Sequence, residues 1–355
     1  MTDPSTSAQE VLAPQMGPPT ILDVSVVIIT YQRPHFVRRC LDHLRAQRRA
    51  PFEVIVVDSS PGGETQQIVT NEYPEVRYAI CSAGRGAMAT ARNIGFNIAT
   101  GHVVAFLDDD AFADPDWLER LAEMYTGPEV GGVGGLADNG RPGAEVEGAD
   151  RIGLVCPDGS LTGYWAANPG RPVEVDHLQG ANMSFRRTAI EEIGGIRDGY
   201  RGTCFCEDTD LCLRIKRRGY HLIYTPFARV AHVGGPLATG RRWDLRYRYW
   251  AQHNHVILLV RNFGLRSALL WRYVLASLRD SVSGTGRLHD VSGKLKDGNF
   301  VGGMRTTARA CIDPFLVIAA TSSGLGRGVL YARSDLDTSV GGSFIGTSEG
   351  VRTAL

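Results

Sequence analysis

The chain has 355 residues, of which 43% are hydrophobic, and 38 Lys and Arg balance 38 Asp and Glu to give a formal net charge of zero. This composition is typical of a globular protein with a sizeable core, and it gives no reason to expect nucleic acid as a partner. The seven cysteines are an odd number without a Cys-x-x-Cys pair. Reduced thiols are therefore expected rather than disulfides, and the cluster of Cys204, Cys206 and Cys212 is a weak candidate for zinc.

Residues 1–20 are rich in Pro, Ser, Thr and Gln and have no basic start followed by an apolar run. They are expected to form a disordered tail and not a signal peptide. No apolar run approaches the ~20 residues that a membrane-spanning helix needs. We therefore expect a cytoplasmic protein, with peripheral contact at the inner membrane face left open.

The first part of the chain alternates apolar strands with helices. Helices are predicted from Pro34 and over residues 87–99, and four buried strands over residues 24–29, 53–58, 77–81 and 102–107. Such alternation indicates an α/β fold with a mostly parallel sheet flanked by helices. Ligands of these sheets bind beyond the carboxyl ends of the strands, where Thr30, Asp58 and Asp108 fall.

The pattern weakens after the fourth strand. Residues 131–180 are rich in Gly and Pro and are expected to form loops, and order returns at Gln179–Phe185. The later elements are predicted as a helix over 207–218, a pair of strands over 220–233 and a helix over 243–262. The last seventy or so residues show no clear period.

Three consecutive aspartates, Asp108, Asp109 and Asp110, directly follow the fourth strand. Clustered carboxylates repel one another, so the group forms either a solvated loop that caps a helix or a divalent cation site beside a nucleotide diphosphate. Alternate residues of an extended segment point the same way, so Asp108 and Asp110 can share one Mn²⁺ or Mg²⁺ while Asp109 faces elsewhere.

An ordered series of motifs resembles glycosyltransferase family 2, whose fold is called GT-A. Leu107–Ala111 looks like the family's Asp-x-Asp motif, and the match runs from Val24 to Asn262. The other matching segments are Val27–Arg33, Val56–Ser60, Gly86–Gly95, Gly180–Arg186, Glu207–Arg214 and Ala231–His232. One departure is Asp58-Ser59-Ser60, where Asp-Asn or Asp-Asp is commoner.

The resemblance implies an inverting enzyme that moves a sugar from a nucleotide diphosphate-sugar to an acceptor hydroxyl with Mn²⁺ or Mg²⁺ as cofactor. It implies a GT-A-like catalytic domain over residues 21–240, with a nucleotide-binding half at 21–110 and an acceptor-side half at 111–240. Residues 241–355 would be a helical or irregular extension. The acceptor, whether a small molecule, a glycan or a lipid-linked sugar, is left open, as is the oligomeric state.

The resemblance also assigns residues. It implies that Asp58 recognises the base and that the rest of the donor site comprises Thr30, Tyr31, Arg33, Arg92, Asp108, Asp109 and Asn182. Arg92 could instead be an ordinary surface residue of an Ala-rich helix, although the site is favoured. With Asp108 and Asp110 proposed, His232 becomes the third protein ligand of the metal; alone, a His after a strand would be an ordinary surface or core residue.

Glu207 and Asp208 lie at a helix start, where free amides and the helix dipole stabilise carboxylates. Helical spacing puts Asp208 on the stripe of Leu211, Cys212 and Ile215, which is predicted to be the buried face, and Glu207 on the stripe of Asp210 and Arg214. Asp208 is therefore the expected general base for the attacking hydroxyl, and Glu207 the second catalytic candidate.

Two other functions are weighed. A sugar-phosphate nucleotidyltransferase would need a Gly-rich basic loop after the first strand, which residues 30–34 lack. A catalytically silent sugar- or nucleotide-binding protein would not need to retain Asp108, Asp110, Asp208 and His232.

The segment 241–272 combines seven Arg with interleaved aromatic residues, among them Trp243, Tyr247, Tyr249, Trp250 and Trp271. Such a segment either lies on an anionic membrane surface or packs on the catalytic domain with its aromatics in the core. In the second case its Arg side chains face water or the diphosphate.

Overall fold

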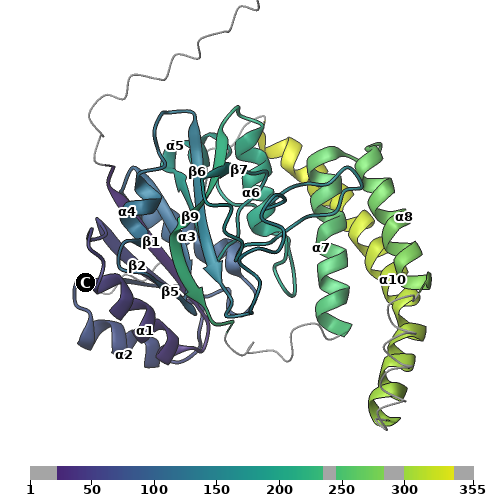
Figure 1. The fold of residues 1–355 in the computed structure, drawn as a ribbon, viewed down its shortest axis with the longest axis horizontal. Coiled ribbons are helices and arrows are strands. Elements are labelled where there is room, and N and C mark those ends of the chain that lie inside the picture. The colour runs from purple at the N-terminus through teal and green to yellow at the C-terminus, as the bar shows by residue number, and fades with distance from the viewer. Residues whose placement is uncertain (1–21, 235–244, 284–299, 340–355) are drawn as a thin grey trace, which may run out of the picture.

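The computed structural model describes residues 22–234, 245–283 and 300–339 (Figure 1). A sheet of nine strands lies at the centre, helices cover both of its faces, and three long helices stand beside it (Figure 1). The predicted mixed α/β architecture is confirmed. The expected tail at residues 1–20 lies outside the described residues.

The strands follow the order β3-β2-β1-β4-β8-β6-β9-β5, with β7 paired to β9. Strands β1 to β4 are mutually parallel, whereas β8 runs antiparallel to both β4 and β6. The winding direction of the sheet reverses between β1 and β4, which opens a crevice at their carboxyl ends. The strands are β1 (Val24–Thr30), β2 (Glu53–Asp58), β3 (Arg77–Ile80), β4 (Val103–Asp108), β5 (Ala111–Ala113), β6 (Val130–Asp138), β7 (Val173–Glu174), β8 (Asn182–Arg186) and β9 (His221–His232).

Successive residues of the central strands are buried on opposite faces of the sheet, which is why these strands are apolar throughout. Val26, Ile28 and Val56 pack under α1, α2 and α4, while Val27 and Ile55 pack under α3, α5 and α6. These helices are α1 (Pro34–Arg45), α2 (Glu64–Glu72), α3 (Met88–Ile98), α4 (Trp117–Ala122), α5 (Arg187–Glu192) and α6 (Glu207–Lys216).

Two predictions for the middle of the chain are wrong. The loop expected from residue 131 is in its first part the buried strand β6, and the strand pair expected over 220–233 is the single long strand β9. The glycines of β6 are required by its neighbours. A Cβ on Gly135 would lie 1.9 Å from the carbonyl oxygen of Ala228, and one on Gly132 would lie 2.6 Å from the Phe185 ring.

The described residues of the extension are mostly helical, including a stretch in which the sequence shows no clear period. Its helices are α7 (Leu245–Phe263), α8 (Ala268–Ser283) and α10 (Phe300–Ser339). Residues 252–260 of α7 are all buried, and α8 and α10 pack against them. Gly324 and Gly328 of α10 allow this approach, since a Cβ on Gly324 would lie 2.8 Å from the His253 carbonyl oxygen.

The expectation that no segment could span a membrane is also wrong by length and composition. Within Ile312–Asp335 of α10, an 18-residue window has a mean hydropathy of 1.3, and 28% of that window is buried. Apolar helices of this length occur both in membranes and in soluble cores.

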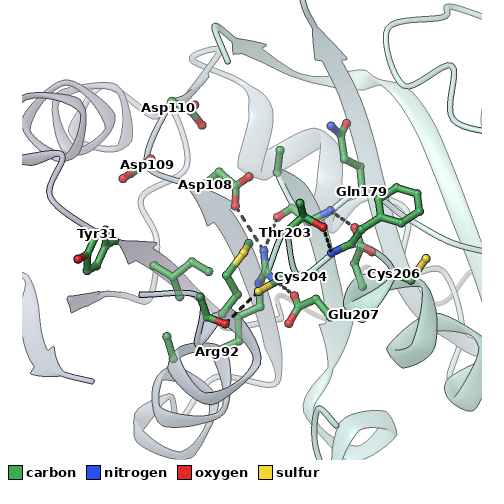
Figure 2. A pocket seen from close by; sticks show the side chains of 18 of the residues that line it. Tyr31, Arg92, Asp108, Asp109, Asp110, Gln179, Thr203, Cys204, Cys206 and Glu207 are labelled. Atoms are coloured by element: carbon green, nitrogen blue, oxygen red, sulfur yellow. Dashed lines mark hydrogen bonds and ion pairs between the residues drawn. The ribbon is translucent and has the colours of Figure 1, made fainter. Parts of the chain in front are cut away.

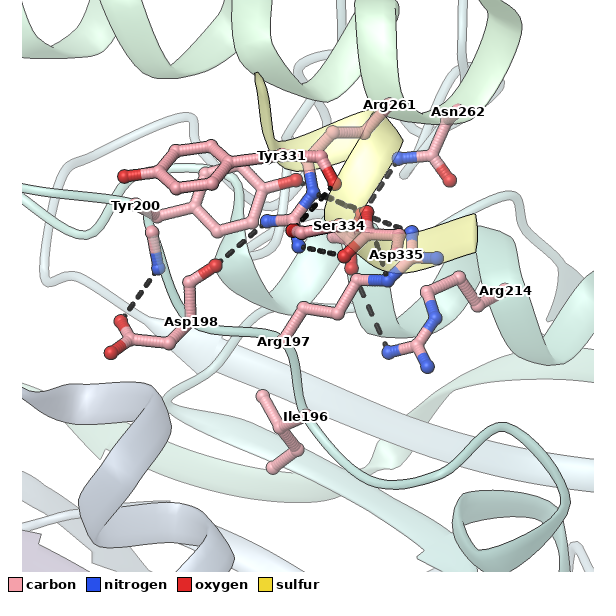
Figure 3. Close-up of polar contacts among 12 residues, drawn as sticks. Ile196, Arg197, Asp198, Tyr200, Arg214, Arg261, Asn262, Tyr331, Ser334 and Asp335 are labelled. Carbon is pink, nitrogen blue, oxygen red and sulfur yellow. Dashed lines mark hydrogen bonds and ion pairs between the residues drawn. The ribbon is translucent and has the colours of Figure 1, made fainter. Parts of the chain in front are cut away.

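A charged cluster ties α10 to the catalytic half (Figure 3). The Arg261 guanidinium of α7 donates to both carboxylate oxygens of Asp335 in α10, at 2.8 and 2.9 Å. Asp335 also lies 3.4 Å from Arg197, whose guanidinium is 3.8 Å from the fully buried Asp210 of α6. Asn262 of α7 donates to Asp210 at 2.7 Å. Helices α6, α7 and α10 therefore share one buried ionic network.

Candidate active site

A cavity of about 640 Å³ lies beyond the carboxyl ends of β1 and β4, next to the first turn of α6. All predicted site residues line it except Asp58 and Asn182. Those that do are Thr30, Tyr31, Arg33, Arg92, Asp108, Asp109, Asp110, Glu207, Asp208 and His232. Of the strand-end residues expected to meet, Thr30 of β1 and Asp108 of β4 line the cavity and Asp58 of β2 does not; residues of α3, α6 and β9 complete the lining.

Asp108, Asp110 and His232 bring one ligand atom each to within 4.8 Å of one another. β5 makes this possible, because it follows the aspartates and pairs with the end of β9, placing Ala111 opposite His232. His232 Nε2 lies 3.3 Å from an Asp110 carboxylate oxygen. Of the His, Cys, Asp and Glu side chains that the structure describes, only these three form such a group, so the cysteines near α6 do not.

The chemistry of this group fits a divalent cation. Two carboxylates and one imidazole are a donor set that Mn²⁺ accepts well and Mg²⁺ accepts less readily. Burial raises the pKa of Asp108, with the neighbouring Asp110 charge adding to the shift and Arg92 opposing it. A bound cation would offset the electrostatic repulsion between these carboxylates.

Asp109 points away from the other two aspartates and is held by residues of the β1 end. It accepts hydrogen bonds from the Thr30 hydroxyl at 2.7 Å and from the Arg33 guanidinium at 2.9 Å. Burial raises the pKa of Asp109 to about 7, although Arg33 opposes the shift. Arg33 also lies 3.3 Å from Asp110 and so partly neutralises the acidic cluster.

Arg92 of α3 is 1% exposed, so the alternative that it is a surface residue is wrong. Its guanidinium lies between Asp108, at 3.3 Å, and Glu207, with which it forms a second ion pair (Figure 2). Arg92 therefore links the acidic cluster at β4 to the first turn of α6.

The expectation that Glu207, Asp210 and Arg214 lie on the less buried side of their helix is wrong. All three are buried: Glu207 pairs with Arg92 of α3, Asp210 accepts from Asn262 of α7 and lies near Arg197, and Arg214 donates to the carbonyl oxygens of Ile193 and Gly195. Burial lowers the pKa of Arg214 to about 10. The spacing of apolar residues within α6 cannot show that residues distant in the sequence bury this side of the helix.

Asp208 is half-buried and faces the cavity. One carboxylate oxygen accepts from the Gly180 amide at 3.0 Å and the other from the Thr209 amide at 2.8 Å. The loop before it is strained, since Cys204 and Cys206 have φ angles of 55° and 74°. Backbone contacts thus fix the orientation of the Asp208 carboxylate.

Two predicted donor residues lie outside the lining of the cavity. Asp58, fully buried, accepts from the Ser60 amide and from the Tyr78 hydroxyl, each at 2.8 Å. Asn182 is a structural residue, because Trp117 donates to its amide oxygen at 2.9 Å and its amide nitrogen donates to two backbone carbonyls. Its position on β8 faces the sheet core rather than the cavity.

Several lining residues were not predicted as site residues, namely Trp165, His177, Gln179, Phe205 and Tyr247. His177 Nε2 lies 3.1 Å from the Thr162 carbonyl, which can only accept, so this nitrogen carries the proton. The Thr209 hydroxyl can then donate to Nδ1 at 3.2 Å. Only Tyr247 had a sequence signal, as part of the basic and aromatic segment.

The chain is similar to known glycosyltransferases. The sequence profile of "Glycosyl transferase family 2" matches residues 25–194. A glucosyl-dolichyl phosphate glucuronosyltransferase of Haloferax volcanii is 29% identical over 250 residues, which cover 67% of this chain and 77% of that protein. Several other curated relatives match over less than half of their own length.

Two solved structures share the fold. A mannosyltransferase of Pyrobaculum calidifontis in complex with GDP-Man and Mn²⁺ has a TM-score of 0.52 at 20% identity, covering 88% of this chain and 90% of that one. GalNAc-T7 with UDP, GalNAc and Mn²⁺ has a TM-score of 0.53 at 18% identity, covering 73% of this chain and 51% of that one.

The chain belongs to glycosyltransferase family 2 and has the GT-A fold. It is a glycosyltransferase.

Proposed function

We propose that this glycosyltransferase moves a sugar from a nucleotide diphosphate-sugar to an acceptor hydroxyl with inversion and with the help of a divalent cation. One observation carries the proposal: a single cavity holds both the group Asp108, Asp110 and His232 and the oriented carboxylate of Asp208. The donors named with the two solved relatives, GDP-Man and UDP with GalNAc, support a nucleotide-linked donor here.

Asp108, Asp110 and His232 would hold Mn²⁺ or Mg²⁺, which when bound supplies positive charge for the departing diphosphate. Thr30, Tyr31 and Arg33 line the same part of the cavity and would contact the nucleotide. Arg92 has a positioning role, because its two ion pairs fix Asp108 relative to Glu207.

Asp208 would take the proton of the acceptor hydroxyl as the oxygen attacks the anomeric carbon. Its bonds to the Gly180 and Thr209 amides hold the carboxylate in place without protonating it. Glu207 is unsuited to this task, because it is 2% exposed and paired with Arg92.

The Haloferax relative acts, by its name, on a glucosyl-dolichyl phosphate, so a lipid-linked sugar is the acceptor that we would test first.

The test is a panel of nucleotide sugars with Mn²⁺, scored for slow donor hydrolysis, in which water replaces the acceptor. With the donor that responds, Asp208→Asn should lower kcat by about a hundredfold or more and leave nucleotide affinity unchanged. Glu207→Gln should reduce turnover less. Equal or reversed effects would show that Asp208 is not the base.

A further inference from the structure

The outer sides of α8 and α10 carry large apolar residues in contact with solvent. On α8 the most exposed are Leu275, at 65%, and Val282, at 72%, and on α10 they are Phe315, at 74%, and Leu330, at 62%. Trp271, Ile312 and Ile318 are also exposed. We call these seven residues the α8–α10 face. Soluble monomers rarely expose many large apolar side chains on one surface without a binding role.

These residues form a stripe on each helix. On α8, Trp271, Leu275 and Val282 are spaced by four and seven residues and therefore share one side, with Arg279 along its edge. On α10, Ile312, Phe315 and Leu330 likewise recur at helical spacing.

The two stripes face away from the catalytic domain. Leu270 and Val274 of α8, and Leu325 and Val329 of α10, pack on the buried residues of α7. Because both helices use their inner sides on α7, their outer sides are left without a protein cover among the described residues (Figure 1).

The charged residues on α8 and α10 favour an anionic partner for the α8–α10 face. The exposed charged residues on the described parts of α8 and α10 are Arg272, Arg279, Arg327 and Arg333 against Asp280. A second copy of this chain, packed face to face by twofold symmetry, would bring these arginines against their own equivalents. An anionic lipid surface instead attracts them, and a tryptophan beside arginines is suited to the bilayer interface.

Ion pairs at both ends keep the apolar stretch Ile312–Asp335 against the protein. Asp313, buried at its start, accepts from Arg248 of α7 at 2.5 and 2.6 Å, and Asp335 at its end accepts from Arg261 of α7. Crossing a bilayer would require α10 to break both pairs and to expose the core of α7, whereas lying on it requires neither. We propose that the α8–α10 face docks on an anionic lipid bilayer and lies along it without crossing it.

The test is flotation of the purified full-length protein with vesicles of phosphatidylcholine alone or mixed with phosphatidylglycerol. We expect binding to the mixed vesicles only, and release by high salt or alkaline carbonate. Arg279→Gln and Arg327→Gln should each weaken partition about fivefold, and Phe315→Ser about tenfold. Phe52→Ser is the matched control, because Phe52 is 54% exposed on the catalytic domain; it should change nothing.

Other outcomes overturn the proposal. Absence of binding to the mixed vesicles, or an equal effect of Phe52→Ser and Phe315→Ser, would show that this face does not dock on lipid. Resistance to both high salt and carbonate would show that α10 crosses the bilayer. A wild-type dimer in sedimentation equilibrium that Phe315→Ser converts to a monomer would assign the face to a second copy. Binding is read without turnover, so failure here leaves the proposed reaction untouched.

Discussion

Replacing Arg92 by Met should strongly destabilise the protein, because it removes the cation between two acidic groups while keeping the length of the side chain. Arg92 and Glu207 are 1% and 2% exposed, so water cannot replace the lost partner of Glu207. Breaking one side of a buried ion pair costs about 3–5 kcal/mol. Asp108, whose side chain is 25% exposed, can recover part of its solvation. Most of the loss should therefore come from Glu207.

A double-mutant cycle separates this cause from a simple packing defect. Urea unfolding should show that Arg92→Met with Glu207→Gln is more stable than Arg92→Met alone, with a coupling free energy of about 2 kcal/mol. Arg38→Met is the matched control, because the Arg38–Glu72 pair is exposed on both sides, and its urea midpoint should stay near that of the wild type. If Glu207→Gln fails to rescue Arg92→Met, the cost lies in packing and the charge argument is wrong.

The remaining predictions concern the metal and the sheet. EDTA treatment or Asp110→Ala should abolish turnover and the rise in melting temperature given by nucleotide diphosphate with Mn²⁺. His232→Ala should weaken Mn²⁺ binding more mildly, because two carboxylates remain. Full activity after EDTA would refute the metal site. Burial raises the pKa of Asp109 to about 7, so deprotonation should destabilise the metal-free protein as the pH rises from about 4 to about 7. Added Mn²⁺ should therefore raise the melting temperature more at about pH 8 than at about pH 5. Equal increases in melting temperature at the two pH values would contradict this linkage. Gly135→Ala should lower the free energy of unfolding by about 1–3 kcal/mol, and Gly62→Ala, where a new Cβ meets nothing within 4 Å, should leave the denaturation midpoint unchanged.

The strands β1 to β4 could be predicted from the sequence because their local signals agree with their tertiary environment. Strands buried on both faces are continuous apolar runs, and Asp108 follows one of them directly. The alternation of Asp108, Asp109 and Asp110 then predicts which carboxylates can share an ion, and the structure places Asp109 on Thr30 and Arg33 instead.

The predictions that failed depended on distant neighbours. The glycines of β6 carry no strand signal, so the sequence predicts a loop there; they are required because Ala228 and Phe185 lie too close for a side chain. The regular part of α10 escaped notice for a similar reason, since small residues such as Gly324 face α7 and interrupt the apolar period. The burial of Glu207 involves its pairing with Arg92 of α3, which lies far earlier in the chain.

The network of Asp210, Arg197, Arg261 and Asp335 has a consequence for how the enzyme is made. Asp210 lies in α6, whereas Asp335 lies in α10. During synthesis α6 therefore leaves the ribosome well before Asp335, whose carboxylate completes the network. Until then Arg261, whose side chain is 3% exposed in the finished protein, lacks its partner. The helix that carries Asp208, the base we propose, thus reaches its final electrostatic setting only after α10 has docked, and a fragment that ends at residue 240 never does.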